Sequence, residues 1–270
     1  MLLARFVSAL TAVTAILVVL FVLPARFISP VILVVVTASA WEWGALSRIE
    51  NRVARIAYAA FIFVCALAYW WFATPDRFLQ VLIAAGVWWA IAAALVLSYP
   101  VRVARALVLV GGPITLVSMF AALDGLARFG SDSDSTGPVL LLFVLVVIWA
   151  ADVGGYFVGK QFGGAKLAPK VSPNKTWAGV LGGLGLSAVV GFAGTVLFPI
   201  GWQQIVSLCL VTAAVSILGD LTISLFKREA GLKDSGTLFP GHGGILDRVD
   251  SISAGAVLFT SGLVFGHGPW

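Results

Sequence analysis

The charged residues of this chain gather in one short stretch, residues 224–250, which reads SLFKREAGLKDSGTLFPGHGGILDRVD. The stretch holds eight of the 29 Asp, Glu, Lys and Arg residues, although 60% of the whole chain is hydrophobic. Carboxylates can hold a divalent cation, while cationic side chains and glycine backbone can hold phosphate. The combination predicts nucleotide or phosphoryl chemistry carried out at a membrane.

A second polar cluster occupies residues 152–179. Five of its glycines permit close approach of the backbone: Gly154, Gly155, Gly159, Gly163 and Gly164. Ser172, Lys175 and Thr176 then precede a predicted helix. Free N–H groups and the helix dipole favour an anion at such an N-terminus, so these residues could form a phosphate seat. The alternative is a purely structural helix cap, because the run does not match the Walker A pattern.

Composition predicts an all-α, polytopic integral membrane bundle that positions these clusters. Charged residues make up 11% of the chain, against about 25% in soluble domains, and the mean hydropathy is +1.05. Apolar runs of about 18 residues or more recur, which suffices to cross hydrocarbon about 30 Å thick. Their continuity favours helices over a barrel. We expect about nine transmembrane helices at residues 6–23, 31–47, 56–74, 78–98, 106–127, 138–158, 177–198, 204–226 and 251–267.

The distribution of Lys and Arg predicts the orientation of the chain. Fourteen of the 17 Lys and Arg residues fall in the N-terminus and the even-numbered loops, and only Arg26, Arg77 and Arg128 fall in the odd-numbered loops. Because basic loops stay on the cytoplasmic side, we expect the N-terminus and the even-numbered loops in the cytoplasm and Trp270 outside.

The two polar clusters lie in the second half of the chain. We expect an N-terminal membrane region over residues 1–135, with about five spans, and a catalytic membrane region over residues 136–270, with about four spans and two polar cytoplasmic loops. Glycine steps at Gly183–Gly185 and Gly191–Gly194 predict close helix packing in the seventh span.

Acidic residues within the predicted spans could share one cavity that opens inward. Glu42, Asp152 and Asp220 fall toward the cytoplasmic ends of their helices, and a charge within hydrocarbon usually faces a polar cavity. Helical spacing places Asp220, Ser224 and Lys227 on one face, so Asp220 either serves the cavity or is neutralised by a nearby base. Glu42 lies between two tryptophans and has an alternative as an interfacial residue beside an aromatic belt.

All six lysines lie between Lys160 and Lys233, within the two largest predicted cytoplasmic loops. A bias that served orientation alone would spread them over every inner loop. We therefore expect one anion site built from these two loops, and the alternative is a surface that attracts anionic lipid head groups.

Residues 224–250 resemble the signature of phosphatidate cytidylyltransferases, also called CDP-diacylglycerol synthases, without a mismatch over the stretch. The upstream run Ser172-Pro173-x-Lys175-Thr176-Trp177, together with Asp152, is similar to the second motif of that family. Ala178 departs from it, since many members carry a glutamate there, so a role of that glutamate has no support in this chain. Residues 1–150 are similar only in being polytopic and hydrophobic.

The resemblance implies that CTP and phosphatidic acid give CDP-diacylglycerol and pyrophosphate, for phospholipid synthesis at a bacterial inner membrane. The lipid phosphate is already an anionic nucleophile, so a strong general base is not required. The difficulty is to bring one anion onto the α-phosphorus of another, which metal ions and cationic side chains overcome.

Mg²⁺ is the cofactor that the resemblance implies, with a second cation as an open alternative. Asp220 and Asp247 are the expected ligands, since hard carboxylate oxygens suit magnesium that keeps water and substrate oxygens. Asp250 and Asp234 are second choices. Asp250 has as alternatives an ion pair with Arg248 or a cap on the ninth helix.

The remaining polar residues are expected to hold the triphosphate and the lipid phosphate. His242 either donates to phosphate or fixes its loop through a backbone carbonyl. Asp152 either lines the cavity or helps to hold a second cation. The expected catalytic residues are Asp220, Asp247, Lys227 and Arg228, and the expected substrate-binding residues are Ser172, Lys175, Thr176, Lys233, His242, Arg248 and Asp152.

The expected partners are CTP, phosphatidic acid and membrane lipids, with no nucleic acid and with a homodimer as an open alternative. Two other functions compete. A CTP-using polyprenol kinase needs the same groups but releases CDP rather than pyrophosphate. A cation-coupled transporter would use Asp152 and Asp220 as ion sites, but such sites lie near the midplane of proteins that often show internal repeats, and this sequence shows neither feature.

Overall fold

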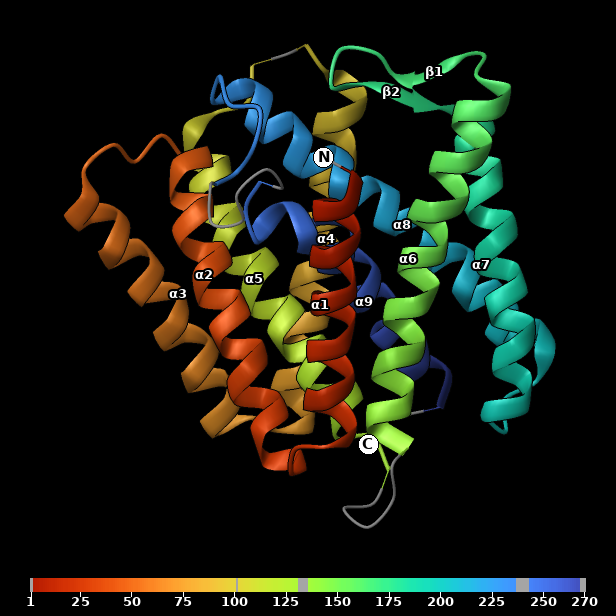
Figure 1. The fold of residues 1–270 in the computed structure, drawn as a ribbon. Helices are drawn as coiled ribbons and strands as arrows, with labels where there is room; N and C mark the ends of the chain where they lie inside the picture. Colours follow the sequence, from red (N-terminus) through yellow and green to blue (C-terminus); the bar gives the residue numbers. More distant parts are fainter. Residues whose placement is uncertain (1, 101, 131–135, 237–242, 268–270) are drawn as a thin grey trace.

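The fold is a bundle of long helices with one short pair of strands at one end (Figure 1). The computed structural model describes residues 2–100, 102–130, 136–236 and 243–267. In this part of the chain, eight helices are long and apolar enough to cross a membrane, and the first contributes the shorter apolar helix Leu10–Phe21. In chain order the elements are α1 (Leu2–Phe21), η1 (Ala25–Phe27), α2 (Ile28–Leu46), α3 (Arg52–Phe72), α4 (Pro75–Ser98), α5 (Arg105–Ala127), α6 (Thr136–Phe162), β1 (Lys166–Ala168), β2 (Ser172–Thr176), α7 (Trp177–Leu197), α8 (Trp202–Glu229) and α9 (Leu246–His267).

Each predicted span corresponds to one helix, with ends that differ by at most five residues. Polar caps set several of the true beginnings. Asn51, Thr74 and Thr176 each occupy the N-cap of a helix, where the side chain accepts a backbone N–H. The largest difference is at α9, which begins five residues before the predicted span, because its first turn carries Asp247 and Arg248, which a hydropathy criterion excludes.

The two strands add to the predicted all-α fold a feature that the sequence did not indicate. β1 and β2 pair antiparallel, with Lys166 opposite Thr176 and Ala168 opposite Ser172. The hairpin lies in the connection between α6 and α7 and ends where α7 begins. It therefore carries Lys166 back toward the N-terminus of α7.

The helices differ strongly in how much of their apolar surface is buried inside the protein. In the most apolar window of α5, 61% of the residues are buried, against 17% in α3 and 22% in α7. Figure 1 shows α3 and α7 at opposite edges of the bundle. An apolar surface of this extent is stable in hydrocarbon rather than in water. The protein is an integral membrane protein with α5 near its centre.

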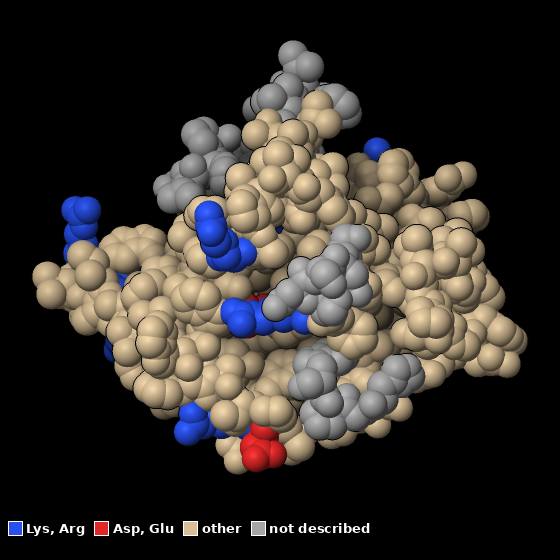
Figure 2. Space-filling model, turned by 90° about the horizontal axis from the view of Figure 1, so that it is seen from below, with Lys and Arg blue, Asp and Glu red and all other residues tan. Residues whose placement is uncertain are grey.

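The even-numbered loops share one end of the bundle, which we call the hairpin end because β1 and β2 lie there (Figure 1). The loop between α2 and α3 contacts the end of α8 there, since the Arg48 guanidinium donates to the carbonyl oxygen of Glu229. The opposite end shows few and scattered charged side chains (Figure 2). The even-numbered loops, which carry most of the Lys and Arg residues, thus lie together at one end of the bundle.

Candidate active site

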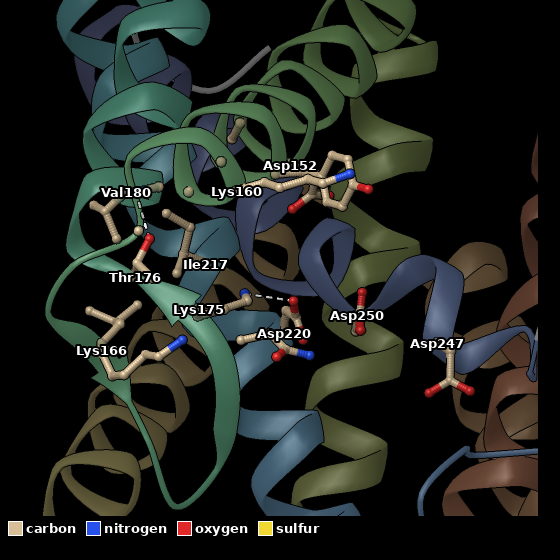
Figure 3. A pocket seen from close by; sticks show the side chains of 18 residues that line it. Asp152, Lys160, Lys166, Lys175, Thr176, Val180, Ile217, Asp220, Asp247 and Asp250 are labelled. Carbon is tan, nitrogen blue, oxygen red and sulfur yellow. Dashed lines mark hydrogen bonds and ion pairs between the residues drawn. The ribbon is translucent and has the colours of Figure 1, made fainter.

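A cavity of about 850 Å³ lies at the hairpin end, among α6, α7, α8, α9 and the two strands (Figure 3). It brings together residues of both predicted polar clusters, which are far apart in the sequence. Lysines and aspartates face it from different elements. These are Asp152 and Lys160 of α6, Lys166 of β1, Lys175 of β2, Asp220 of α8, and Asp247 and Asp250 of α9.

Glycines allow α6 and α7 to pack closely behind the cavity. A Cβ atom at Gly179 would stand 2.8 Å from the carbonyl oxygen of Gly155, and one at Gly183 would stand 2.6 Å from that of Ala151. Both distances are too short for a real side chain, so the close packing predicted for the seventh span is confirmed. Gly185 is an exception, since a Cβ atom there would meet no atom within 4 Å.

Asp220 forms an ion pair with Lys175, across the cavity wall between α8 and β2. The Lys175 Nζ atom lies 2.6 Å from Asp220 Oδ2, and the side chains are 24% and 25% exposed. Ser224 donates to Asp220 Oδ1 at 3.1 Å, which confirms the predicted shared helix face. Asp220 is indeed neutralised by a base, but the base comes from the hairpin and both partners remain reachable from the cavity.

Lys227 forms the second ion pair, with Asp247 at the start of α9. Its Nζ atom lies 2.7 Å from Asp247 Oδ1, and the two side chains are 11% and 13% exposed. The other oxygen, Oδ2, accepts the backbone N–H groups of Ser235 at 2.9 Å and Gly244 at 3.0 Å. Asp247 therefore holds the connection between α8 and α9 as well as lining the cavity.

Asp152 and Asp250 meet at Ser251. The Ser251 hydroxyl donates to Asp152 Oδ2 at 3.1 Å, and its backbone N–H donates to Asp250 Oδ1 at 2.8 Å. Asp220 and its partner Lys175 line the same cavity. This side of the cavity therefore gathers three aspartates around one lysine.

The carboxylates offer hard oxygen donors, which suit Mg²⁺ better than a softer metal. In the described part of the chain, no group of three or more His, Cys, Asp or Glu is arranged to hold a metal ion. The donor set therefore fits a cation that takes one or two carboxylates and completes its coordination with water and substrate oxygens.

Lys160 and Lys166 line the cavity, although neither was among the predicted binding residues. The concentration of lysines between residues 160 and 233 was the sequence signal for them. Thr176 also lines the cavity, but it is 4% exposed. Its hydroxyl oxygen accepts the Gly179 N–H at 3.0 Å, so the structural reading of this residue as a helix cap is correct.

Several of the predicted site residues do not line the cavity that the described residues form. The Arg228 Nε atom donates to the Val171 carbonyl oxygen at 3.4 Å, which ties α8 to the hairpin. Lys233 and Asp234 are exposed in the connection after α8. His242 lies outside the described residues. The predicted residues found away from the cavity lining are Ser172, Lys227, Arg228, Lys233, Asp234 and Arg248.

Glu42 neither lines the cavity nor lies at an exposed interface, so both predicted interpretations of this residue are wrong. It is 3% exposed. Its oxygens accept the N–H groups of Ile245 at 3.0 Å and Leu246 at 2.8 Å and the Ser235 hydroxyl at 2.7 Å. Glu42 of α2 thus caps the N-terminus of α9.

Asp124 is a further acid within a span, which the predicted set of intramembrane acids omitted. It lies in α5 and is 4% exposed. The Arg128 Nε atom lies 3.1 Å from it, one turn along the same helix. This pair neutralises the charge locally, toward the end of the bundle opposite the cavity.

The apolar helices and the charged cavity together define a polytopic membrane protein with a site for charged ligands. The chain belongs to the cytidylyltransferase family, whose model matches residues 3–265. It is similar to the phosphatidate cytidylyltransferase of Pseudomonas aeruginosa, with 41% identity over 97% of this chain and 96% of the relative. It is also similar to that of Haemophilus influenzae, with 36% identity over 96% of this chain and 98% of the relative. The family expected from residues 224–250 is confirmed.

Proposed function

We propose that this protein transfers the CMP group of CTP to phosphatidic acid, forming CDP-diacylglycerol and pyrophosphate for phospholipid synthesis. The observation that carries the proposal is the cavity, in which lysines of α6, β1 and β2 face aspartates of α6, α8 and α9. Membership in the family and the names of the two relatives that match over nearly their whole length support the same reaction.

The reaction needs neutralisation and alignment more than proton transfer. A phosphate oxygen of phosphatidic acid forms a bond to the α-phosphorus of CTP. The bond from that phosphorus to the oxygen bridging to the β-phosphate breaks, and pyrophosphate leaves with the bridging oxygen. Lys160, Lys166 and Lys175 supply positive charge for the phosphates, since a lysine acts as a mobile point charge. Holding both reactants in line lowers the entropic part of the barrier.

Mg²⁺ is part of the proposal because the carboxylates fit it. Two of the aspartates would hold the ion directly, Asp220 with either Asp247 or Asp250. Asp247 would do so through Oδ1, in place of Lys227, since its other oxygen already accepts two backbone N–H groups. Asp152 is available for a second cation. Asp234 leaves the proposal because it is exposed away from the cavity. When bound, Mg²⁺ supplies positive charge that polarises phosphate oxygens.

We infer that the hairpin end faces the cytoplasm of a bacterial inner membrane. The basic loops at this end support the orientation, and CTP is available on that side. The lipid substrate would then reach the same cavity from the bilayer. A homodimer remains an open alternative, which the mass of the detergent-solubilised protein would decide.

The experiment uses purified protein in liposomes that contain phosphatidic acid, with CTP and with or without Mg²⁺. We expect Mg²⁺-dependent release of pyrophosphate together with formation of the CDP-lipid. A well-folded preparation that releases no pyrophosphate contradicts the proposal. Release of CDP with a polyprenol substrate would instead indicate the kinase.

A further inference from the structure

Two carboxylates hold the chain on both sides of the connection between α8 and α9. We call the described residues that they hold, 235–236 and 243–246, the neck. Glu42 joins the Ser235 hydroxyl on one side of the neck to two backbone N–H groups on the other side. Asp247 joins the N–H of Ser235 to the N–H of Gly244. Both carboxylates therefore link the segment at residues 235–236 to the segment at residues 243–246.

The neck fits tightly around the side chain of Glu42. A Cβ atom added to Gly236 or to Gly244 would overlap the Glu42 carboxylate. The carboxylate accepts three hydrogen bonds in a buried position. Hydrogen bonds to an ionised group are shorter and stronger than neutral ones, and buried N–H groups that lose their acceptor are destabilised. Glu42 therefore contributes, with Asp247, to the position of the neck.

A continuous chain of contacts leads from Glu42 to the cavity. Glu42 accepts the Ser235 hydroxyl at 2.7 Å, the Ser235 N–H donates to Asp247 at 2.9 Å, and Asp247 pairs with Lys227 at 2.7 Å. Glu42 itself does not line the cavity. It is 193 residues from Ser235 in sequence, so the contact joins the N-terminal membrane region to the site.

We propose that Glu42 is a positioning residue of the active site, which holds the neck so that Asp247, with its partner Lys227, keeps its orientation toward the cavity. The inference rests on the proposed function, because the orientation matters for catalysis only if the cavity performs that reaction. The competing interpretation is a helix anchor that stabilises the fold without affecting turnover.

The test compares Glu42→Gln with Asp124→Asn, a buried acid in α5 toward the opposite end. The amide of Glu42→Gln puts an N–H donor against groups that are themselves donors. Glu42→Asp keeps the charge with a shorter side chain, and Ser235→Ala removes one hydroxyl. For each variant, kcat and the KM for CTP are measured per folded enzyme in liposomes, and backbone hydrogen exchange is followed in peptides that cover the neck.

We expect Glu42→Gln to lower kcat about 10- to 100-fold, as misplacement of reacting groups does, with little change in the KM for CTP. Exchange should rise in the neck, and Glu42→Asp should recover part of both effects. Asp124→Asn should leave kcat and neck exchange at the wild-type level. A Glu42→Gln variant with raised exchange but unchanged kcat overturns the proposal, and so does one in which neither quantity changes.

If Glu42→Gln does not fold, Ser235→Ala tests the positioning role of Glu42 in its place. We expect it to raise exchange in the neck and to lower kcat by a smaller factor, and an unchanged kcat overturns the proposal. Failure of the proposed function has a different outcome, because the wild-type protein then releases no pyrophosphate. The exchange comparison between Glu42→Gln and Asp124→Asn still reports whether Glu42 holds the neck.

Discussion

The ion pair between Lys175 and Asp220 is the most informative contact to perturb. Its atoms are 2.6 Å apart and each side chain is about a quarter exposed. The Coulomb attraction at this distance is about 6 kcal/mol with an effective dielectric constant of about 20. Desolvation offsets most of it, so a charged hydrogen bond of this kind stabilises by about 1.5–3 kcal/mol. Asp220→Asn should lower the free energy of unfolding by that amount, which leaves the protein folded.

The effect on turnover should be much larger than the effect on stability. Asp220→Asn removes a proposed cation ligand, and loss of one electrostatic contact to a transition state costs about 100- to 1,000-fold in kcat. Pyrophosphate release at saturating CTP measures turnover, and thermal unfolding in detergent measures stability. The double variant Lys175→Met/Asp220→Asn separates the two roles. It should recover stability, because neither charge is left unpaired, but it should not recover kcat.

Two results would refute this reasoning. Near-normal kcat in folded Asp220→Asn would mean that the carboxylate does not take part in the reaction. Recovery of both stability and kcat in the double variant would mean that the pair serves the fold alone. Lys175→Met by itself breaks the same pair and leaves the carboxylate in place, so it is the matched control for stability. Its kcat should also fall, because Lys175 is a proposed phosphate ligand.

Three further predictions concern other parts of the site. Asp247→Asn should remove most pyrophosphate release while the protein stays inserted in membranes, as carbonate extraction would show; normal turnover would exclude it as a ligand. Gly183→Ala should destabilise the folded protein by about 1–3 kcal/mol, because its Cβ atom overpacks against the Ala151 carbonyl. Gly185→Ala, in open space, should instead stabilise the fold by up to about 1 kcal/mol. Equal melting temperatures of the two variants would contradict this. Lys166→Met should raise the KM for CTP about tenfold, or about 1.4 kcal/mol, and an unchanged KM would remove Lys166 from the phosphate site.

The spans were predictable because the thickness of the hydrocarbon sets the length of an apolar helix. The ends of the spans were less predictable where polar residues form the first turn of a helix. Asp247 lies in the first turn of α9, and a hydropathy criterion treats such a turn as loop. The hairpin was not predictable, since β1 has three residues and β2 five, too few to show a pattern.

The site was predictable where it depends on local spacing. Ser224 bonds to Asp220 one turn away, as helical periodicity requires. The partner of Asp220 was not predictable, because Lys175 reaches it only after the hairpin folds and α7 packs on α6. Glu42 shows the same limit, since its partners lie in another half of the chain and its neighbouring tryptophans suggested an interface. Tertiary packing, rather than residue type, decides both contacts.

The pairing of Lys175 with Asp220 makes the affinities of the site for an anion and a cation interdependent. A phosphate that takes Lys175 away from Asp220 leaves a carboxylate oxygen open to a cation, and a cation on Asp220 releases Lys175 for phosphate. Each ligand should therefore strengthen the binding of the other by the same factor, as thermodynamic reciprocity requires. With neither bound, the two side chains satisfy each other, so we expect the cavity to bind either ligand more weakly when the other is absent.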